Sequence, residues 1–475
     1  MPIDPFTLVS PPLFAAADLR EIEHRWTAAH PGRPLMAGAG AAAADLACML
    51  ARDTGEPILV LAGPGNNGGD ALVTARLLAA QGFRVVVVSR ADPARLPPDA
   101  ARAWADWRDA GGNALTDVPA GQSFGLVVDG LYGVGLVRAI EGEDARWIGL
   151  ANAMACPRLA LDVPSGLDGD TGQVRGCAVR ADHTLTFLGL KPGLLTADGP
   201  DHAGTLHLDA LGVEPDMLPA VAGSALTRLE ARHRLPPRPR NSHKGVFGHA
   251  GVVGGAQGMV GAALIAGRAA LAYGAGAVTL GVLDARVAVD YGEPRLMFAP
   301  PERLVAAPLD VLALGPGLGQ AAQARVLLET ALASTCPLVL DADALNLLAG
   351  DPALSEMAAR RTAPTLLTPH PGEAARLLAC GTYDVQADRI AAASMLARRF
   401  RAHVALKGAG TVVTHPQGRY AINTTGGPHL AQAGSGDRLT GIVVALLAQG
   451  MAPGDALEAA VWRHGSEPSI PPAAI

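Results

Sequence analysis

The sequence has few cysteines, few aromatic residues and little excess charge, and each shortage excludes a class of protein. Its five cysteines lie far apart, with no CxxC pair and no histidine at ligand spacing, so neither a zinc knuckle nor a disulfide framework is indicated and a reducing cytoplasm is expected. Aromatic residues make up 4% of the chain and the net charge is -6, which offers no basic face for nucleic acid or anionic lipid.

Long apolar runs with export or membrane character are also missing. The segment "MPIDPFTLVS" does not place an apolar stretch after a basic one, and the most apolar later stretch, 259–283, is rich in Gly and Ala and interrupted by Arg268. We therefore expect no export signal and no membrane span.

What the chain does contain is a repeated alternation of short apolar runs and helical patterns. At 475 residues and 49% hydrophobic content, it is long enough for about two or three domains. Continuous Val/Leu runs separated by helices, including one after Gly69 and one over 259–273, predict parallel sheets covered by helices on both faces. Strands are predicted at 57–62, 84–89, 125–129, 157–162, 184–187, 249–255, 277–282, 311–317, 337–343, 365–370 and 403–408.

A segment poor in periodicity, 220–243, separates the two halves. Because it contains three prolines among several arginines, we place a domain boundary there and predict domains at 1–222 and 223–475. Its basic run, 232–244, is interpreted as a solvated linker.

In the first half, a predicted strand leads directly into the glycine-rich string "GPGNNGGDALVTARLLA". The glycines Gly63, Gly65, Gly68 and Gly69 would let backbone N–H groups approach a phosphate at the start of the following helix. The string is neither GxGxxG nor a Walker motif, so a tight strand-to-helix turn remains the alternative.

Two further strand ends in this half carry oxygen-bearing side chains. "VVDGLYGVGLVRAI" places Asp129 at one strand end, and "LALDVPSGLDGDTG" places Asp162 and Ser165 at another. Asp129 and Ser165, taken together with Asn67, offer oxygen ligands only, and a hard cation prefers such ligands. Taken singly, each residue would also serve as a turn or cap residue.

The second half ends with "AGSGD" directly before a long apolar helix. The N–H groups of Ser435 and Gly436 suit charge on a transferring phosphoryl group. Asp437 could accept the proton of the attacking hydroxyl, although Asp at a helix start is also a common cap. "VALKGAGT", with Lys407, suits a nucleotide's phosphates or ribose, and "ALGPGLG" and "TPHPGEAARLL" add further loops at strand ends; turns and caps explain each singly.

The first half resembles the NAD(P)H-hydrate epimerase domain, a Rossmann-like three-layer α/β/α fold, through "GPGNNGGD", "VVDGLYGVGL", "DVPSGLDGDTG" and "ADHTLTFLGLKPGLL". The resemblance covers about residues 10 to 215 and implies Asp162 as a catalytic carboxylate that touches the substrate. It also implies K⁺ on Asn67, Asp129 and Ser165. Ala71 stands where the family usually has Gly. The residues implied to hold the hydrate are Asn66, Asn67, Gly68, Gly69, Asp70, Gly133, Val134, Gly135, Leu136, Val137, Arg138 and Ala139.

The second half resembles the ADP/ATP-dependent NAD(P)H-hydrate dehydratase, a ribokinase-like α/β fold, over roughly 226–465, through the strings above together with "KGVFGHAGVVGG" and "LVLDADALNLL". The resemblance implies Asp437 as the base, with Mg²⁺ and ADP or ATP as co-substrate; "TPHPGE" and "KGAGT" favour ADP. The implied hydrate site is Gly317 and His370, Pro371, Gly372 and Glu373, continuing to Arg376. The implied nucleotide site is Lys407, Gly408, Ala409, Gly410, Thr411, Ser435 and Gly436.

Four departures from the family pattern concern the second half. Arg295 stands where Glu is usual, Gly427 where Asn is usual, and Arg438 where a small apolar residue is usual. The adjacent positive charge of Arg438 is expected to lower the pKa of Asp437. After "AVWRHG" the chain ends in "SEPSIPPAAI", where the family usually continues into another helix, which we expect to affect stability more than chemistry.

These patterns lead to one main hypothesis and two alternatives. The main one is a cytoplasmic, homo-oligomeric, bifunctional enzyme with no nucleic-acid or membrane partner. It would epimerise the R and S forms of NADHX and NADPHX and dehydrate the S form to NAD(P)H at the expense of ADP or ATP. The first alternative makes the second half a small-molecule kinase, for which a stable phosphorylated product would be diagnostic. The second makes the first half a non-catalytic ligand-sensing or interaction module.

Overall fold

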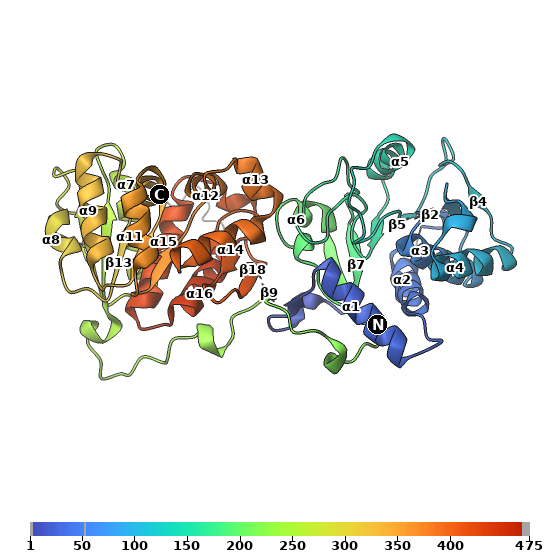
Figure 1. The fold of residues 1–475 in the computed structure, drawn as a ribbon, viewed down its shortest axis with the longest axis horizontal. Helices are drawn as coiled ribbons and strands as arrows, with labels where there is room; N and C mark the ends of the chain where they lie inside the picture. Colours follow the sequence, from blue (N-terminus) through green and yellow to red (C-terminus); the bar gives the residue numbers. More distant parts are fainter. Residues whose placement is uncertain (1–2, 52–53, 468–475) are drawn as a thin grey trace. The chain divides into compact units, whose positions relative to one another are not determined.

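The computed structural model describes residues 3–51 and 54–467, which form two compact units that divide between Gly223 and Ser224. In Figure 1 the first unit runs from blue to green and the second from green to red. Each unit is an α/β structure built on its own sheet, so the predicted α/β class is confirmed.

The sheet of the first unit has the strand order β4-β3-β2-β5-β6-β7-β8, and each neighbouring pair is parallel. The strands are β2 (Ile58–Ala62), β3 (Val85–Val88), β4 (Ala114–Leu115), β5 (Leu126–Gly130), β6 (Arg158–Leu161), β7 (His183–Phe187) and β8 (Thr205–Asp209). The helices are α1 (Ala16–Ala29), α2 (Leu35–Ala51), α3 (Asn66–Ala80), α4 (Pro98–Asp109), α5 (Gly142–Ala153) and α6 (Gly199–Ala203).

Alternate residues of its central strand enter two different cores. Ile58 and Val60 pack with the apolar side chains of α1 to α4, whereas Leu59 and Leu61 pack with Trp147 and other residues of α5. Successive side chains of a strand point to opposite faces, so a continuous apolar run is what a strand covered on both faces requires. The unit therefore has the three layers that were predicted.

The strand order reverses between β2 and β5. From β2 the chain moves outward to β3 and β4, and then returns to the other side of β2 with β5. A crevice opens at the carboxyl ends of strands at such a switch point. The loops after β2 and β5 are the two that carry the glycine-rich strings, so the topology brings them together.

The second unit has the strand order β9-β18-β17-β16-β15-β14-β13-β10-β11-β12. Its strands are β9 (Gly223–Leu226), β10 (His249–Gly254), β11 (Ala277–Val282), β12 (Met297–Phe298), β13 (Val311–Leu314), β14 (Leu338–Leu340), β15 (Thr365–Leu367), β16 (His403–Leu406), β17 (Val412–Thr414) and β18 (Tyr420–Asn423). Its helices are α7 (Val260–Ala272), α8 (Pro301–Val305), α9 (Ala322–Ala333), α10 (Ala342–Gly350), α11 (Pro352–Arg360), α12 (Pro371–Leu378), α13 (Thr382–Ala387), α14 (Arg389–Phe400), α15 (Ser435–Ala448) and α16 (Pro453–Ser466).

Strands β10 to β16 are parallel, and helices cover both faces of the sheet. Helices α7, α15 and α16 share one core with Val252, Leu280 and Val339, while α8 and α14 pack against strands β10 and β16. The parallel strands β13 to β16 end at one edge, where the loops that begin with Gly315, Asp341, Thr368 and Lys407 meet. That edge carries the candidate site of this unit.

The predicted strands are confirmed to within a few residues, but strands β4, β8, β9, β12, β17 and β18 were not predicted. Strands β17 and β18 form an antiparallel hairpin beside β16, and nothing in their short runs had indicated it. The linker interpretation of 232–244 is wrong at its start, because His233 is fully buried and Arg232 bonds Glu458 at 2.8 Å and Asp455 at 2.9 Å. The later residues of this run are exposed.

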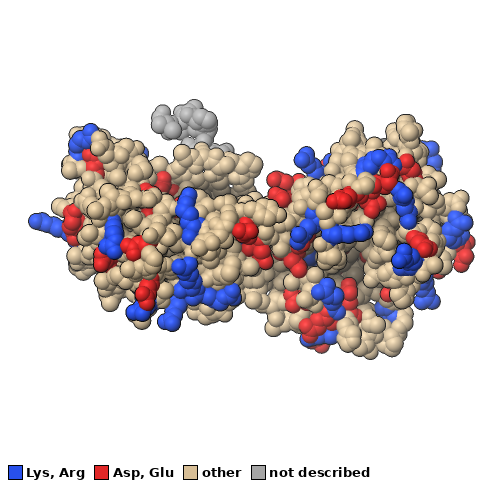
Figure 2. All heavy atoms as spheres, turned by 45° about the horizontal axis from the view of Figure 1, so that its top comes forward, with Lys and Arg blue, Asp and Glu red and all other residues tan. Residues whose placement is uncertain are grey.

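The described helices include none that is long and apolar enough to cross a membrane. On the face shown in Figure 2, basic and acidic side chains are interspersed rather than gathered into a field of one sign.

Candidate functional sites

A cavity of about 770 Å³ opens at the switch point of the first unit. Its size is typical of a small-molecule site. Helices α1 to α4 and the loops after β2, β5, β6, β7 and β8 form its walls. The sequence-predicted residues that line it are Asn66, Asn67, Asp70, Gly133, Val134, Gly135, Leu136, Val137, Arg138 and Asp162.

Three other predicted hydrate residues, Gly68, Gly69 and Ala139, are not among the described residues that line this cavity. Packing inside the protein explains why the first two positions are glycine. A Cβ on Gly68 would lie 2.0 Å from the carbonyl oxygen of Gly63, and one on Gly69 would lie 2.5 Å from Met36. These glycines allow α3 to pack tightly against its neighbours. A direct contact of these three residues with a ligand stays a prediction.

Asp162 sits at the cavity wall in a strained backbone conformation, with φ of +67°. Its carboxylate accepts a hydrogen bond from the ammonium of Lys191, which is 1% exposed and also donates to Thr186 Oγ1 at 2.8 Å and to the carbonyl of Phe187 at 2.7 Å. Positive φ in a non-glycine residue costs of order 1 kcal/mol or more and clusters at functional sites. The fold thus fixes this carboxylate beside a buried cation.

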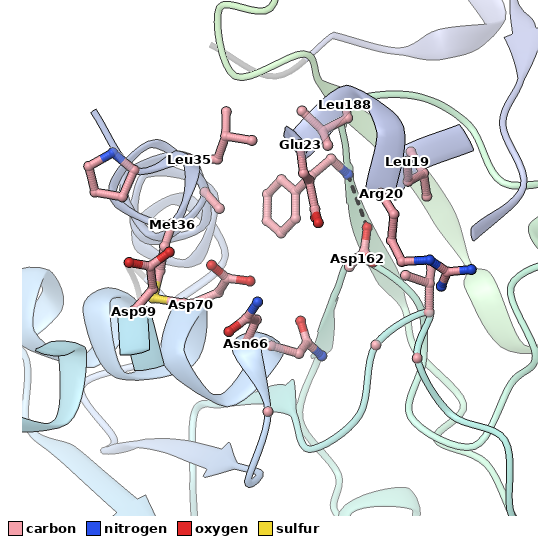
Figure 3. A pocket seen from close by; sticks show the side chains of 18 of the residues that line it. Leu19, Arg20, Glu23, Leu35, Met36, Asn66, Asp70, Asp99, Asp162 and Leu188 are labelled. Carbon is pink, nitrogen blue, oxygen red and sulfur yellow. Dashed lines mark hydrogen bonds between the residues drawn. The ribbon is translucent and has the colours of Figure 1, made fainter. Parts of the chain in front are cut away.

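Three further carboxyl groups face the same cavity (Figure 3). Asp70 comes from α3, Glu23 from α1 and Asp99 from α4. Burial, together with the charges of Asp162, Glu23 and Asp99, raises the pKa of Asp70 well above its ordinary value. Burial and the charge of Asp162 also raise the pKa of Glu23.

Of the three predicted cation ligands, Asp129 and Ser165 contact each other, and Asn67 lines the cavity. Asp129 is fully buried; its two carboxylate oxygens accept from Ser165 N–H at 2.8 Å and Ser165 Oγ–H at 2.6 Å. Burial raises the pKa of Asp129 to about 6. Asn67 is 8% exposed, and neither its amide oxygen nor its amide nitrogen has a hydrogen-bond partner among the described residues.

A buried amide group without a hydrogen-bond partner lowers the stability of the fold, so we expect a bound ion or ligand to contact the Asn67 side chain. An oxygen donor set of amide, carboxylate and hydroxyl fits a hard monovalent cation such as K⁺.

In the second unit, Asp437 lies in the first turn of α15. Burial and the charge of Asp341 raise the pKa of Asp437 to about 6, while Lys407 acts in the lowering direction. Lys407 Nζ donates to Asp341 Oδ1 at 2.8 Å, and Thr440 Oγ1 donates to Asp341 Oδ2 at 2.8 Å. A Cβ on Gly436 would lie 3.2 Å from Lys407 Nζ, so glycine leaves room for this ammonium group.

Lys407 also reaches the predicted hydrate segment. Its Nζ lies 3.9 Å from a carboxylate oxygen of Glu373, whose other contact, at 2.8 Å, is the backbone N–H of His370. Although burial alone would lower it, the charges of Asp341, Glu373 and Asp437 raise the pKa of Lys407. The structure therefore brings together the predicted base, the predicted nucleotide lysine and the predicted hydrate residues.

A chain of contacts ties the remaining loops of this edge. Arg376 donates to Asn346 Oδ1 at 2.6 Å, and Gly319 N–H donates to Asp343 Oδ2 at 2.8 Å, which fixes the glycine loop to α10. Gly317 has φ of +59°, and a Cβ there would lie 2.5 Å from the carbonyl oxygen of Met259. This glycine is required by packing.

The predicted nucleotide loop, Lys407 to Thr411, is supported from beneath by Arg389. This side chain is 1% exposed and donates to the carbonyls of Leu406 at 3.2 Å and Lys407 at 3.3 Å. Gly408 has φ of +141°, and a Cβ there would lie 2.8 Å from the guanidinium. A buried cation thus sets the course of the loop.

The expected effect of Arg438 on Asp437 is wrong. The pKa of Asp437 is raised rather than lowered, through burial and Asp341, and the Arg438 guanidinium instead pairs with Glu467. The other departures leave the site in place: Arg295 is a surface residue paired with Glu293, and Gly427 precedes a short helical turn. The end of the chain from residue 468 lies outside the described residues.

The group His233, Asp455 and Glu458 has its ligand atoms within 4.8 Å of one another. It is built as an ion-pair network, because Arg232 bonds both carboxylates. The backbone N–H of Glu230 donates to His233 Nδ1 at 3.0 Å, which places the ring proton on Nε2, toward Glu458. A metal ion could bind that nitrogen only if it carried no proton.

Sequence reasoning missed Lys191, Asp341, Thr440 and Arg389. Two of them carried a usable signal, since Asp341 follows an apolar run in "LVLDAD" and Lys191 follows one in "LTFLGLK". Polar residues at the carboxyl ends of parallel strands meet at the ligand edge. Thr440 and Arg389 lie inside helical patterns and gave no such signal.

Comparison with known families finds matches in both units. Residues 250–468 match the family described as NAD(P)H-hydrate dehydratase, and residues 32–193 match the family described as YjeF-related protein N-terminus.

Curated relatives match across both units. The bifunctional NAD(P)H-hydrate repair enzyme Nnr of Escherichia coli (strain K12) is 38% identical over 451 residues, covering 92% of this chain and 84% of the relative. Its namesake from Thermofilum pendens is 35% identical over 460 residues, covering 91% and 86%. Among solved structures, an ADP/ATP-dependent NAD(P)H-hydrate dehydratase from Bacillus subtilis, co-crystallised with ATP and Mg²⁺, is 33% identical, covers 50% of this chain and 84% of that chain, and has a TM-score of 0.43.

Proposed function

This chain belongs to the family of bifunctional NAD(P)H-hydrate repair enzymes, and we propose on that premise that its first unit epimerises NADHX and NADPHX while its second unit dehydrates one epimer to NAD(P)H. The observation that best supports the second activity is the group formed by Asp437, Lys407 and Asp341 at the start of α15. The curated relatives carry the repair-enzyme name across both units, which favours repair over the small-molecule kinase alternative.

In the first unit, the hydrate occupies the cavity at the switch point. Epimerisation needs reversible loss and regain of the hydroxyl group or ring opening, and in this proposal Asp162 takes up and returns the proton. Lys191 holds this carboxylate in position. Replacing Asp162 with Asn should slow epimer exchange without abolishing hydrate binding; unchanged exchange in that variant would remove Asp162 from the mechanism.

Asn67, Asp129 and Ser165 would hold K⁺ beneath the cavity. When bound, the ion would supply positive charge that satisfies the Asn67 amide oxygen and orients the loops after β2, β5 and β6. The protein groups themselves hold the loops through the hydrogen bonds between Asp129 and Ser165.

In the second unit, hydroxide is a poor leaving group and the dehydration needs its activation. Asp437 accepts the proton of the hydrate's hydroxyl as that oxygen attacks the terminal phosphorus of ADP or ATP. Expulsion of phosphate, with loss of a proton from the adjacent ring carbon to solvent, then forms the C=C bond that restores the reduced nicotinamide. Lys407 and the N–H groups of Ser435 and Gly436 face the transferring phosphoryl group, where their positive charge is most useful. Mg²⁺ would enter on the nucleotide's phosphate oxygens and offset their charge.

One assay with two variants tests both activities. The protein is incubated with mixed hydrate epimers, ADP, Mg²⁺ and K⁺, and the absorbance of reduced nicotinamide is followed to its end point. The wild type should convert all of the hydrate, Asp162→Asn should convert one epimer quickly and the other slowly, and Asp437→Asn should convert neither while still exchanging the epimers. A stable phosphorylated product would instead identify a kinase, and an unchanged epimer ratio would identify a binding module.

A further inference from the structure

The cavity of the first unit holds carboxyl groups on two opposite walls. In Figure 3, Asp162 stands on one side of the open space and Asp70 on the other, with Asn66 between them. Asp162 comes from the loop after β6 and Asp70 from the first turns of α3. A planar ring held between these walls would therefore present one face to each carboxyl group.

The two groups have opposite surroundings. Asp162 pairs with the buried Lys191 ammonium. Among the described residues, no ion pair or hydrogen bond engages the Asp70 carboxyl group. Burial, together with the negative charges around it, raises the pKa of Asp70 well above its ordinary value. A carboxyl group whose surroundings disfavour its ionisation is suited to act as the proton donor.

The charged groups that face Asp70 come from every wall. The carboxylates are Glu23 of α1, Asp99 of α4 and Asp162. The other titratable groups lining the cavity are Arg20, His30, Arg33, Arg102, Tyr132, Arg138 and Lys191. Burial is the largest cause of the raised pKa of Asp70, and the charges of the three carboxylates add to it.

We propose that Asp70 is a second catalytic residue of the epimerase half, which donates a proton to the hydroxyl leaving one face of the hydrate while Asp162 removes a proton from the water that adds to the other face. This assignment rests on the proposed epimerase function and gives that same site a two-sided mechanism. Without this assignment, Asp70 is only one of several residues implied to contact the substrate.

The step balances without any added reagent. Asp70 gives its proton to the hydroxyl group, the C–O bond breaks, and water departs while the ring nitrogen's electron pair forms a C=N⁺ double bond. A second water attacks the opposite face, its oxygen forms the new C–O bond, and its proton passes to the Asp162 carboxylate. Asp70 is left as the carboxylate and Asp162 as the acid, which are the protonation states needed for the reverse direction.

The main test replaces Asp70 with Asn and measures epimer exchange in both directions against pH. The variant should exchange at least about 100-fold more slowly, as expected for loss of a general acid, while hydrate binding measured by calorimetry stays within about threefold. The wild-type rate should fall at alkaline pH as Asp70 ionises, and this alkaline limb should be absent from the residual rate of the variant.

Asp99→Asn is the matched control, because it removes a charge that perturbs Asp70 but leaves the proton donor in place. Its alkaline limb should remain and should move to lower pH, since a nearby negative charge that raises the pKa of Asp70 has been removed.

Thermal unfolding distinguishes misfolding of the Asp70→Asn variant from loss of a catalytic group. The folded protein holds the Asp70 proton more tightly than the unfolded chain, so the ionisable carboxyl group costs stability as pH rises above the unfolded value of about 3.9. Asp70→Asn should thus unfold at an equal or higher temperature than the wild type at pH 7. Normal exchange in Asp70→Asn, or an alkaline limb that persists in it, would overturn the assignment of Asp70, whereas a wild type that never changes the epimer ratio would overturn the epimerase function itself.

Discussion

Because the charge of Asp341 acts on Asp437, we predict the pH at which dehydratase activity falls on the acid side of its pH profile. A base must be ionised to accept a proton, so a pKa of about 6 for Asp437 places the acid limb of kcat/KM near pH 6. Replacing Asp341 with Asn removes a negative charge that raises this pKa. It also frees Lys407 from its 2.8 Å partner, which acts in the same direction, so the limb should move to lower pH.

The size of the shift follows from electrostatics. At an effective dielectric constant of about 20, two unit charges about 8 Å apart interact by about 2 kcal/mol, which corresponds to about 1.5 pH units. With the limb moved from about pH 6 to about pH 4.5, the ionised fraction of Asp437 at pH 5 would rise from roughly 0.1 to roughly 0.8. Relative to its own plateau, the variant should therefore keep about eightfold more activity at pH 5 than the wild type keeps.

The assay follows reduced nicotinamide from the reactive epimer at saturating ADP and Mg²⁺ between pH 4.5 and 8.5. Titration of ADP is common to all proteins compared, so differences between the profiles report the protein. Thr440→Val is the matched control, because it removes the 2.8 Å hydrogen bond to Asp341 without changing a charge and should leave the limb near that of the wild type. A limb that stays in place or moves upward in Asp341→Asn would refute the assignment of Asp437 as the base.

Three further predictions concern buried groups. Lys191→Met leaves Asp162 without its buried cation and should lower the free energy of unfolding of the first unit by roughly 3–5 kcal/mol, measured by denaturant titration; a loss below 1 kcal/mol would contradict the pairing. Asn67→Ala should abolish any rise in melting temperature when K⁺ replaces Na⁺ at constant ionic strength, and an unchanged K⁺ response would place the ion elsewhere. Burial alone would raise the pKa of Glu458, but hydrogen bonds from His233 and His415 hold it well below its ordinary value, so its stabilisation is complete above about pH 4.5 and is lost as pH falls. Glu458→Gln should thus cost roughly 3 kcal/mol at pH 7 and progressively less below pH 4.5, whereas a pH-independent difference in thermal unfolding would disprove this.

Much of the architecture could be predicted from the sequence because it is a local property. Runs such as 57–62 and 311–314 are apolar at every position, as a strand buried on both faces is expected to be. The hairpin of β17 and β18 escaped prediction because its strands are short and take their partners from a sheet already formed.

The sequence by itself determined the two α/β units, the glycine strings at their strand ends and the candidate base at the start of α15, since each depends on residues adjacent in the chain. The tertiary structure alone decided which charges face one another: Lys191 and Asp162 lie 29 positions apart, Lys407 and Asp341 lie 66 apart, and His233 and Glu458 lie 225 apart. The physical reason is that the carboxyl ends of parallel strands converge at one edge, and packed helices bring distant residues to that edge or to a shared core. Burial there sets the pKa of a carboxyl group, and no local pattern reports how deeply a group will be buried or which charge will stand beside it.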